Sequence, residues 1–86
     1  MNNLIKKTNT YSLIVHNDHF NKFEYVVKCL VEICNHSIEQ AEQCTYLIHF
    51  KGECQVKKGY YKDLFNYHKK LIFYGITCNI VDLYNT

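Results

Sequence analysis

The sequence contains no proline and only three glycines, so few residues are available to end a helix or turn the chain. Proline is the strongest helix terminator, and in its absence glycine, asparagine and serine must mark the ends of elements. Such residues occur at Asn17-Asp18, at Asn35-His36-Ser37 and at Gly52, Gly59 and Gly75. They divide the chain into short apolar segments, each of which can be interpreted as one helix or strand.

The length of the chain allows a single compact core. A chain of 86 residues buries about two-thirds of the surface that its unfolded form exposes. A hydrophobic share of 48% and a charged share of 21%, without a run of like charges, are typical of a folded globular domain. We therefore expect one domain over residues 11–86, preceded by a flexible polar tail over residues 1–10.

Charge, hydropathy and cysteine usage exclude several classes of protein. The net charge of +2 is too small for the clustered basic face of a nucleic-acid-binding domain. No apolar stretch approaches the ~20 residues of a membrane helix, and residues 1–10 lack the apolar core of a secretion signal. The five cysteines include no C-x-x-C pair, which favours reduced thiols over a disulfide framework. We therefore expect a cytoplasmic monomer that binds neither nucleic acid nor membrane.

Apolar periodicity predicts three strands and three helices in the order β-α-α-β-α-β. Runs of β-branched residues and strict alternation indicate strands, whereas apolar residues recurring every three to four positions indicate helices. The expected strands cover 11–16, 53–57 and 77–83, and the expected helices cover about 22–34, 37–51 and 61–72. We expect an α+β fold in which helices pack on one three-stranded antiparallel sheet.

The second helix carries a specific start signal. Ser37-Ile38-Glu39-Gln40 fits a capping box, in which the serine hydroxyl accepts from the backbone N–H of Gln40 and the glutamine side chain reaches back. This pattern predicts that the helix begins directly after Ser37.

Polar side chains at the ends of two elements could form one binding site. Asn17 and Asp18 follow the first strand, and His49 lies near the end of the second helix. A carboxylate, an amide oxygen and an imidazole nitrogen can together accept the three N–H donors of an ammonium group. Apolar residues beside them could line a small pocket: Phe23, Val26, Thr45 and Ile48. Such a site would suit the first residue of a peptide.

Each of these features also has an ordinary structural explanation. Asn-Asp after a strand is commonly a turn or a helix cap, and His49 can interact with the last carbonyls of its helix. A zinc site fits none of the standard ligand spacings, although histidine and cysteine are available at His16, His19, His36, Cys34 and Cys44. A Cys-His nucleophile is disfavoured because every cysteine lies on an apolar stripe or strand. We therefore expect neither a metal nor a cofactor.

Three segments together resemble the ClpS adaptors, the bacterial N-degron receptors that feed substrates to a Clp AAA+ protease. The segments are Tyr11-Ser-Leu-Ile-Val-His-Asn-Asp18, Phe23-Glu-Tyr-Val-Val27 and Ala41-Glu-Gln-Cys-Thr-Tyr-Leu-Ile-His49-Phe-Lys-Gly52. Their order and spacing match over about residues 11–83. The resemblance implies a βααβαβ fold and a pocket for N-terminal Leu, Phe, Tyr or Trp residues.

The resemblance also implies roles for individual residues. Asn17, Asp18 and His49 would hold the α-amino group of the substrate, and Asn21 would contact the backbone of the peptide. Phe23 stands where many members have a methionine that gates the pocket, and the walls would be Val26, Thr45, Ile48 and Ile76. Asp63 loosely matches a surface that docks the N-terminal domain of a ClpA- or ClpC-type chaperone. The implied partners are that chaperone and N-degron substrates, with no catalysis.

Departures from the family pattern leave two other functions open. His19 stands where many members have a second acidic residue, and the start of the third helix matches only loosely. One alternative is a non-catalytic interaction module on the same α+β scaffold with a decayed pocket. The other is a small enzyme that uses His49 and Asp18 as acid and base, although the chain shows no nucleophile elbow, phosphate loop or metal spacing.

Overall fold

The computed structural model describes residues 10–83, and the elements follow the predicted order. The strands are β1 (Tyr11–His16), β2 (Glu53–Gly59) and β3 (Cys78–Asp82), and the helices are α2 (Phe23–Cys34), α3 (Ile38–Lys51) and α4 (Tyr61–Phe73). The predicted α+β fold is thereby confirmed, with small differences at the ends of the elements. The tail predicted for residues 1–10 lies outside the described residues except for Thr10.

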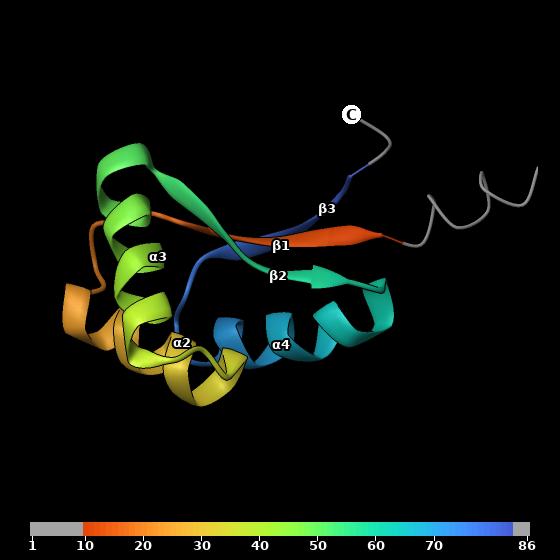
Figure 1. Cartoon of the computed structure of the whole chain (residues 1–86), viewed down its shortest axis with the longest axis horizontal. Helices are drawn as coiled ribbons and strands as arrows, with labels where there is room; N and C mark the ends of the chain where they lie inside the picture. Colours follow the sequence, from red (N-terminus) through yellow and green to blue (C-terminus); the bar gives the residue numbers. More distant parts are fainter. Residues whose placement is uncertain (1–9, 84–86) are drawn as a thin grey trace, which may run out of the picture.

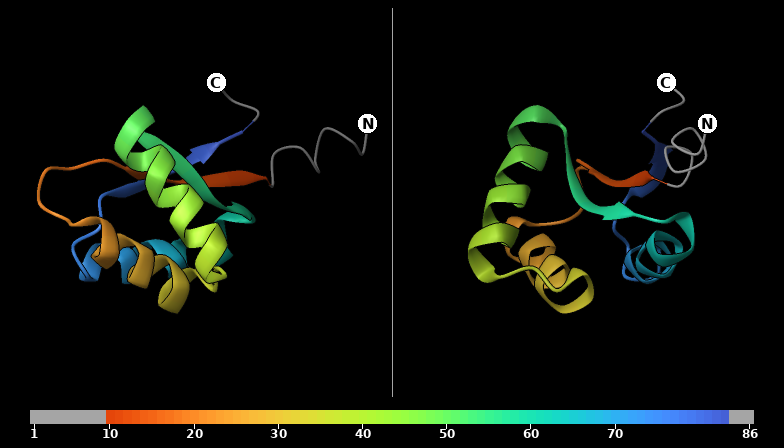
Figure 2. Two further views of the ribbon diagram at one scale, coloured as in Figure 1. Left: turned by 60° about the vertical axis from the view of Figure 1, so that its left-hand side comes forward. Right: turned by 45° about the vertical axis from the view of Figure 1, so that its right-hand side comes forward.

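The sheet has the order β2-β1-β3, with β1 antiparallel to both neighbours. The pairing of β1 with β2 shifts register between Leu13 and Ile14. α2 and α4 lie on one side of the sheet, and α3 stands beside α2 and β2 (Figures 1 and 2). The loops that enter α2 and leave α3 therefore meet at one end of the central strand.

The core lies between the sheet and the helices. Leu13 and Val15 alternate along β1, so both side chains point toward the helical side and are almost fully buried. The helices contribute residues spaced three or four apart, which places them on one face of each helix. The principal helical core residues are Val26, Cys29, Leu30, Ala41, Ile48, Leu64 and Leu71.

Local signals define the ends of the helices. The predicted capping box is present: the Ser37 hydroxyl accepts from the Gln40 N–H at 3.1 Å, and the Gln40 side chain accepts from the Ser37 N–H at 3.3 Å. α2 ends at Asn35, which has a φ of 60°, and α3 ends at Gly52, which has a φ of 96°. Both residues adopt the left-handed conformation that ends a helix at low cost.

Membrane-spanning helices and clusters of metal-binding side chains are both absent from the part of the chain that the structure describes. Within residues 10–83, no helix is long and apolar enough to cross a membrane. In the same range, no three His, Cys, Asp or Glu side chains lie close enough to bind a metal ion.

All five cysteines are free thiols, and burial raises the pKa of Cys34 to about 12 and that of Cys78 to about 11. These two thiols therefore stay protonated at neutral pH.

Candidate functional site

Three segments that are distant in the sequence meet at the end of β1. The N–H of His16 donates to the carbonyl of Thr77 at 2.9 Å, just before β3. The N–H of Asn17 donates to the carbonyl of Gly52 at 2.8 Å, at the end of α3. These two hydrogen bonds hold the loop after β1 beside the last turn of α3, and so beside His49.

The carboxylate of Asp18 organises this loop. Its Oδ1 accepts from the backbone N–H groups of Phe20 and Asn21 at 3.0 and 2.9 Å. Its Oδ2 accepts from the side chains of Asn21 and Thr77 at 2.8 and 3.2 Å. Two carboxylate oxygens offer about four acceptor positions, so these donors occupy them all. Asp18 therefore contributes its charge to the site rather than an unoccupied acceptor.

The same contacts keep Asp18 ionised. Desolvation, the largest single effect, raises the pKa of Asp18. The hydrogen bonds from Asn21, Phe20 and Thr77 together outweigh it, so the pKa lies below its ordinary value. Among residues 10–83, no lysine or histidine forms an ion pair with this carboxylate. Asp18 is therefore negatively charged at neutral pH, without an ion-pair partner among residues 10–83.

His49 presents one ring nitrogen as an acceptor. Its Nδ1 lies 3.1 Å from the carbonyl oxygen of Thr45, one turn earlier in α3. A carbonyl oxygen only accepts, so Nδ1 carries the proton in this contact, and Nε2 of the neutral ring is left as an acceptor. The ring of Phe23 packs against that of His49, with centroids 5.6 Å apart. The helix backbone and Phe23 thus set the tautomer and orientation of the imidazole.

Asn17 supplies a second acceptor. Its backbone is bound to Gly52, but its side-chain amide makes no hydrogen bond within residues 10–83. The Asn17 side chain is exposed, and it lines the same cavity as His49. An amide oxygen, an imidazole nitrogen and a nearby carboxylate charge are therefore available together.

One cavity gathers most of the residues singled out in the sequence. Its lining includes Asn17, Asp18, Asn21, Val26, Ile48, His49 and Ile76, together with Val15 and His16. Val26, Ile48 and Ile76 are almost fully buried and supply the apolar part of the wall. The cavity has a volume of about 10 Å³, which is about the space that one water needs, whereas an apolar cavity that binds benzene has about 150 Å³. The cavity as described is therefore too small to hold a leucine or phenylalanine side chain.

Two residues expected in the pocket do not line this cavity. Thr45 is fully buried, and its hydroxyl donates to the carbonyl of Ala41 at 2.7 Å, so it faces its own helix. Phe23 lies at the start of α2 and packs its ring against His49 and, edge-on, against Tyr46. Both residues support His49 from outside the cavity instead of forming its wall.

The sequence did not identify every residue of the site. Val15 and His16 line the cavity, and Thr77 binds the carboxylate of Asp18. The alternation of β1 places Val15 on the inner face, so this residue could have been found from the strand pattern. Nothing in the local sequence links Thr77 to Asp18, because the two residues lie in different segments of the chain.

Asp63 lies apart from the cavity. It is exposed in the first turn of α4 and lines a separate groove near Lys58 and Tyr67. A contact between a cysteine and a histidine also lies outside the cavity, where the Cys78 thiol is 3.3 Å from Nδ1 of His68. Because Cys78 is buried and its pKa is raised, this contact is a structural hydrogen bond of a thiol.

Comparisons with known proteins place the chain among known adaptors. The sequence model of the family described as "ATP-dependent Clp protease adaptor protein ClpS" matches residues 6–78. The Clp protease adapter ClpS of Thermosynechococcus vestitus is 35% identical over 78% of this chain and 72% of its own length. ClpS of a Nostoc species is 35% identical over 88% of this chain and 80% of its own length. The solved structure of Agrobacterium tumefaciens ClpS2 bound to L-phenylalaninamide has a similar fold, with a TM-score of 0.80 and 15% identity over 85% of this chain and 95% of that one.

Proposed function

The chain belongs to the ClpS family of ATP-dependent Clp protease adaptors, and on this premise we propose that it binds the free N-terminal residue of N-degron substrates. The expected first residues are Leu, Phe, Tyr and Trp. The single observation that carries the proposal is the cavity in which Asn17, Asp18 and His49 lie beside an apolar wall. A positive amine and an apolar side chain are the two features of such a terminus.

The polar end of the cavity suits a protonated α-amine. An α-amino group has a pKa near 8, so it is mostly an ammonium at pH 7. The ammonium would donate to the Asn17 side-chain oxygen and to Nε2 of His49, while the charge of Asp18 stabilises it from behind. Each charge-assisted hydrogen bond contributes about 1.5–3 kcal/mol. This arrangement rejects an acetylated terminus, which has neither the charge nor the donors.

The apolar end would take the first side chain. Val26, Ile48 and Ile76 are buried, and covering a Leu or Phe side chain there contributes roughly 1.5–3 kcal/mol. After the cost of association, a complex in the micromolar range, near −8 kcal/mol, is expected. The cavity must enlarge to admit the side chain, and the cost of that opening lowers the affinity. The structural relative that is bound to L-phenylalaninamide holds a ligand with a free amine and an aromatic side chain.

The bound substrate would then pass to a Clp AAA+ chaperone in the cytoplasm. The proposed docking partner is the N-terminal domain of a ClpA- or ClpC-type chaperone, and Asp63 in the exposed first turn of α4 is the proposed contact. Asn21 is proposed to contact the peptide backbone, because it borders the cavity and is held by Asp18 and Gly75. We expect a monomer that performs no reaction and needs no cofactor.

An acid-base role for His49 and Asp18 has little support. The proton-bearing nitrogen of His49 faces a backbone carbonyl, not a carboxylate, and the oxygens of Asp18 accept four other hydrogen bonds. The decayed-pocket alternative has one observation in its favour, the small volume of about 10 Å³. A comparison of binding by a free peptide and by its acetylated twin distinguishes the receptor function from a decayed pocket.

The test is a titration with peptides that differ only at the first residue. Fluorescence anisotropy should detect Leu- and Phe-initiated peptides, with the acetylated Phe twin as the matched control. The acetylated peptide should bind at least about 100-fold more weakly, because it lacks two charge-assisted hydrogen bonds. Equal affinity of the two twins, or binding of neither, would refute the receptor function and leave the interaction module.

A further inference from the structure

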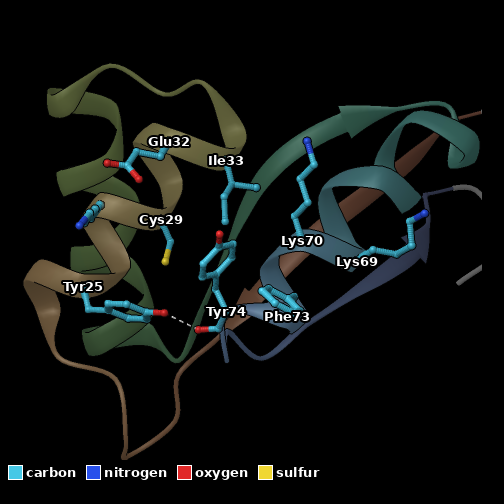
Figure 3. A pocket seen from close by; sticks show the side chains of 9 residues that line it. Tyr25, Cys29, Glu32, Ile33, Lys69, Lys70, Phe73 and Tyr74 are labelled. Carbon is cyan, nitrogen blue, oxygen red and sulfur yellow. Dashed lines mark hydrogen bonds between the residues drawn. The ribbon is translucent and has the colours of Figure 1, made fainter.

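A second hollow lies between α2 and α4, on residues that the proposed terminal-residue site does not use. This groove has a volume of about 700 Å³, within the range of about 300–1,000 Å³ that is usual for ligand pockets. The side chains of Cys29 and Ile33 come from α2, that of Phe73 comes from the end of α4, and that of Tyr74 follows directly after it (Figure 3). Phe73 is 81% exposed, so a large ring is left uncovered by residues 10–83.

The groove is preformed by the packing of the two helices. Tyr25, Cys29 and Ile33 are four residues apart and therefore lie along one face of α2. The hydroxyl of Tyr25 donates to the carbonyl of Tyr74, which ties the start of α2 to the end of α4 (Figure 3). One end of the groove is thereby held at a defined width, which lowers the cost of ordering it around a ligand.

Positive charge is concentrated along this groove. Lys28, Lys69 and Lys70 line it, together with Glu32. An adjoining groove of about 560 Å³ between α4 and β2 shares Glu32, Ile33 and Lys70, and it adds Lys57, Lys58 and Asp63. We call the two grooves together the lysine groove. Five lysines and two carboxylates give it a formal charge of +3, which exceeds the +2 of the whole chain.

We propose that the lysine groove binds an acidic amphipathic segment of a partner protein. A large apolar side chain of the segment would lie against Cys29, Ile33 and Phe73, and its carboxylates would face the lysines. Apolar anchors flanked by charges are the usual way in which a short segment occupies a groove between helices. This inference goes beyond the proposed terminal-residue site, because the ligand needs no free N-terminus and the groove shares no residue with that cavity. Asp63, which lines the adjoining groove, is also the proposed chaperone contact.

The composition of the groove favours a peptide over a nucleic acid. Glu32 and Asp63 line it among the lysines, and they would repel a continuous phosphate backbone. A peptide can instead place its carboxylates only where lysines stand and its apolar side chains only where the floor is apolar.

The test uses the full chain and a fluorescent, N-acetylated helical peptide of about 15 residues with Glu on one face and Leu and Phe on the other. The acetyl group keeps this probe out of the terminal-residue cavity. Its twin carries Lys at every Glu position. In low salt the acidic peptide should bind, and the basic twin should bind at least about tenfold more weakly.

A charge reversal locates the binding surface. Lys69→Glu together with Lys70→Glu should weaken binding of the acidic peptide by at least about tenfold. Lys62→Glu is the matched control, because Lys62 is exposed on α4 but lines neither groove, and it should change binding by less than about twofold. Unchanged affinity of the double variant for a free Phe-initiated peptide would show that its fold is intact.

Several results would overturn the proposal. These are equal binding of the acidic and basic peptides, binding of neither, an equal effect of Lys62→Glu, and displacement of the acidic peptide by a single-stranded oligonucleotide that binds more tightly. Failure of the terminal-residue site is a separate result. It would appear as loss of discrimination between free and acetylated Phe peptides while the acidic peptide still binds.

Discussion

The small cavity at the end of β1 and the lysine groove beside α4 differ in size and in chemistry. The cavity has a volume of about 10 Å³ and is bordered by a carboxylate, an amide and an imidazole. The main part of the groove has about 700 Å³ and is bordered by lysines around an apolar floor. The larger hollow is therefore the one with fewer oriented hydrogen-bonding groups.

The difference shows that empty volume and selectivity are separate properties. Volume shows where packing is loose, whereas selectivity requires polar groups that are held in place before the ligand arrives. Around the cavity, backbone carbonyls and loop donors orient Asp18 and His49. Along the groove, each lysine presents a point charge on a long stem, and the ammonium groups of Lys57 and Lys69 lie over the rings of Tyr67 and Phe65. Such groups attract a charge type more than a particular chemical group.

Loss of both unoccupied acceptors should have the largest effect. Asn17→Ala together with His49→Ala removes two charge-assisted hydrogen bonds of about 1.5–3 kcal/mol each, so affinity for a Phe-initiated peptide should fall more than about 100-fold. Isothermal titration calorimetry measures this loss. The acidic acetylated peptide should bind the same variant normally, and a parallel loss of both ligands would mean that the two sites are not independent.

Neutralising Asp18 should have a smaller effect on binding. Asp18→Asn removes the negative charge and replaces an acceptor with a donor next to Asn21 and Thr77. Affinity for the Phe-initiated peptide should fall about tenfold, and the free energy of unfolding should fall by about 1–3 kcal/mol. Urea unfolding and peptide titration measure the two effects. Unchanged peptide affinity would show that Asp18 does not contribute to binding of the α-amine.

The contribution of Asp18 to stability should depend on pH. Its pKa is lower in the folded chain than the ordinary 3.8, so folding favours the ionised form. That stabilisation is complete above about pH 4 and disappears as the pH falls through the folded pKa. The difference in unfolding free energy between the original chain and Asp18→Asn should therefore be larger at pH 7 than at pH 3. An equal difference at both pH values would contradict the lowered pKa.

A small change in the wall should alter the preference for the first side chain. Ile76→Val removes one methyl group from the cavity, at a cost of about 0.5–1.5 kcal/mol in stability. The wider cavity should raise the affinity for Phe relative to Leu by a few-fold, measured by competition between the two peptides. Ile80→Val is the matched control, since Ile80 lies in β3 but not in the cavity lining. The same shift in both variants would show that Ile76 does not determine the preference between Phe and Leu.

The smallest expected effect is a difference in how the two sites respond to salt concentration. The Debye length falls from about 10 Å at 0.1 M to about 3 Å at 1 M, so exposed lysines are screened more than a partly enclosed site. Between low and high salt, binding of the acidic peptide should weaken several-fold, and binding of the Phe-initiated peptide should change by less than about twofold. Anisotropy titrations across a salt series would measure both. Equal slopes would contradict the difference in electrostatic character.

The sequence by itself determined the elements of this protein and the identity of the polar triplet. The capping box at Ser37 and the breaks at Asn35 and Gly52 depend on residues within one turn, so local chemistry is sufficient to place them. Asn17 and Asp18 are neighbours after a strand, and His49 lies near the end of a helix. Their positions at the ends of elements suggested a shared site, and the family resemblance added the roles of the individual residues.

Only the tertiary structure decided how those residues are used. The bond between Thr77 and Asp18 joins residues 59 positions apart, and it helps to fill the acceptor positions of a carboxylate that was expected to accept from an ammonium group. The small volume of the cavity, the packing of Phe23 on His49 and the groove between α2 and α4 likewise arise where separate elements pack. Such features depend on long-range packing distances of a few ångströms, and neither residue periodicity nor composition encodes those distances.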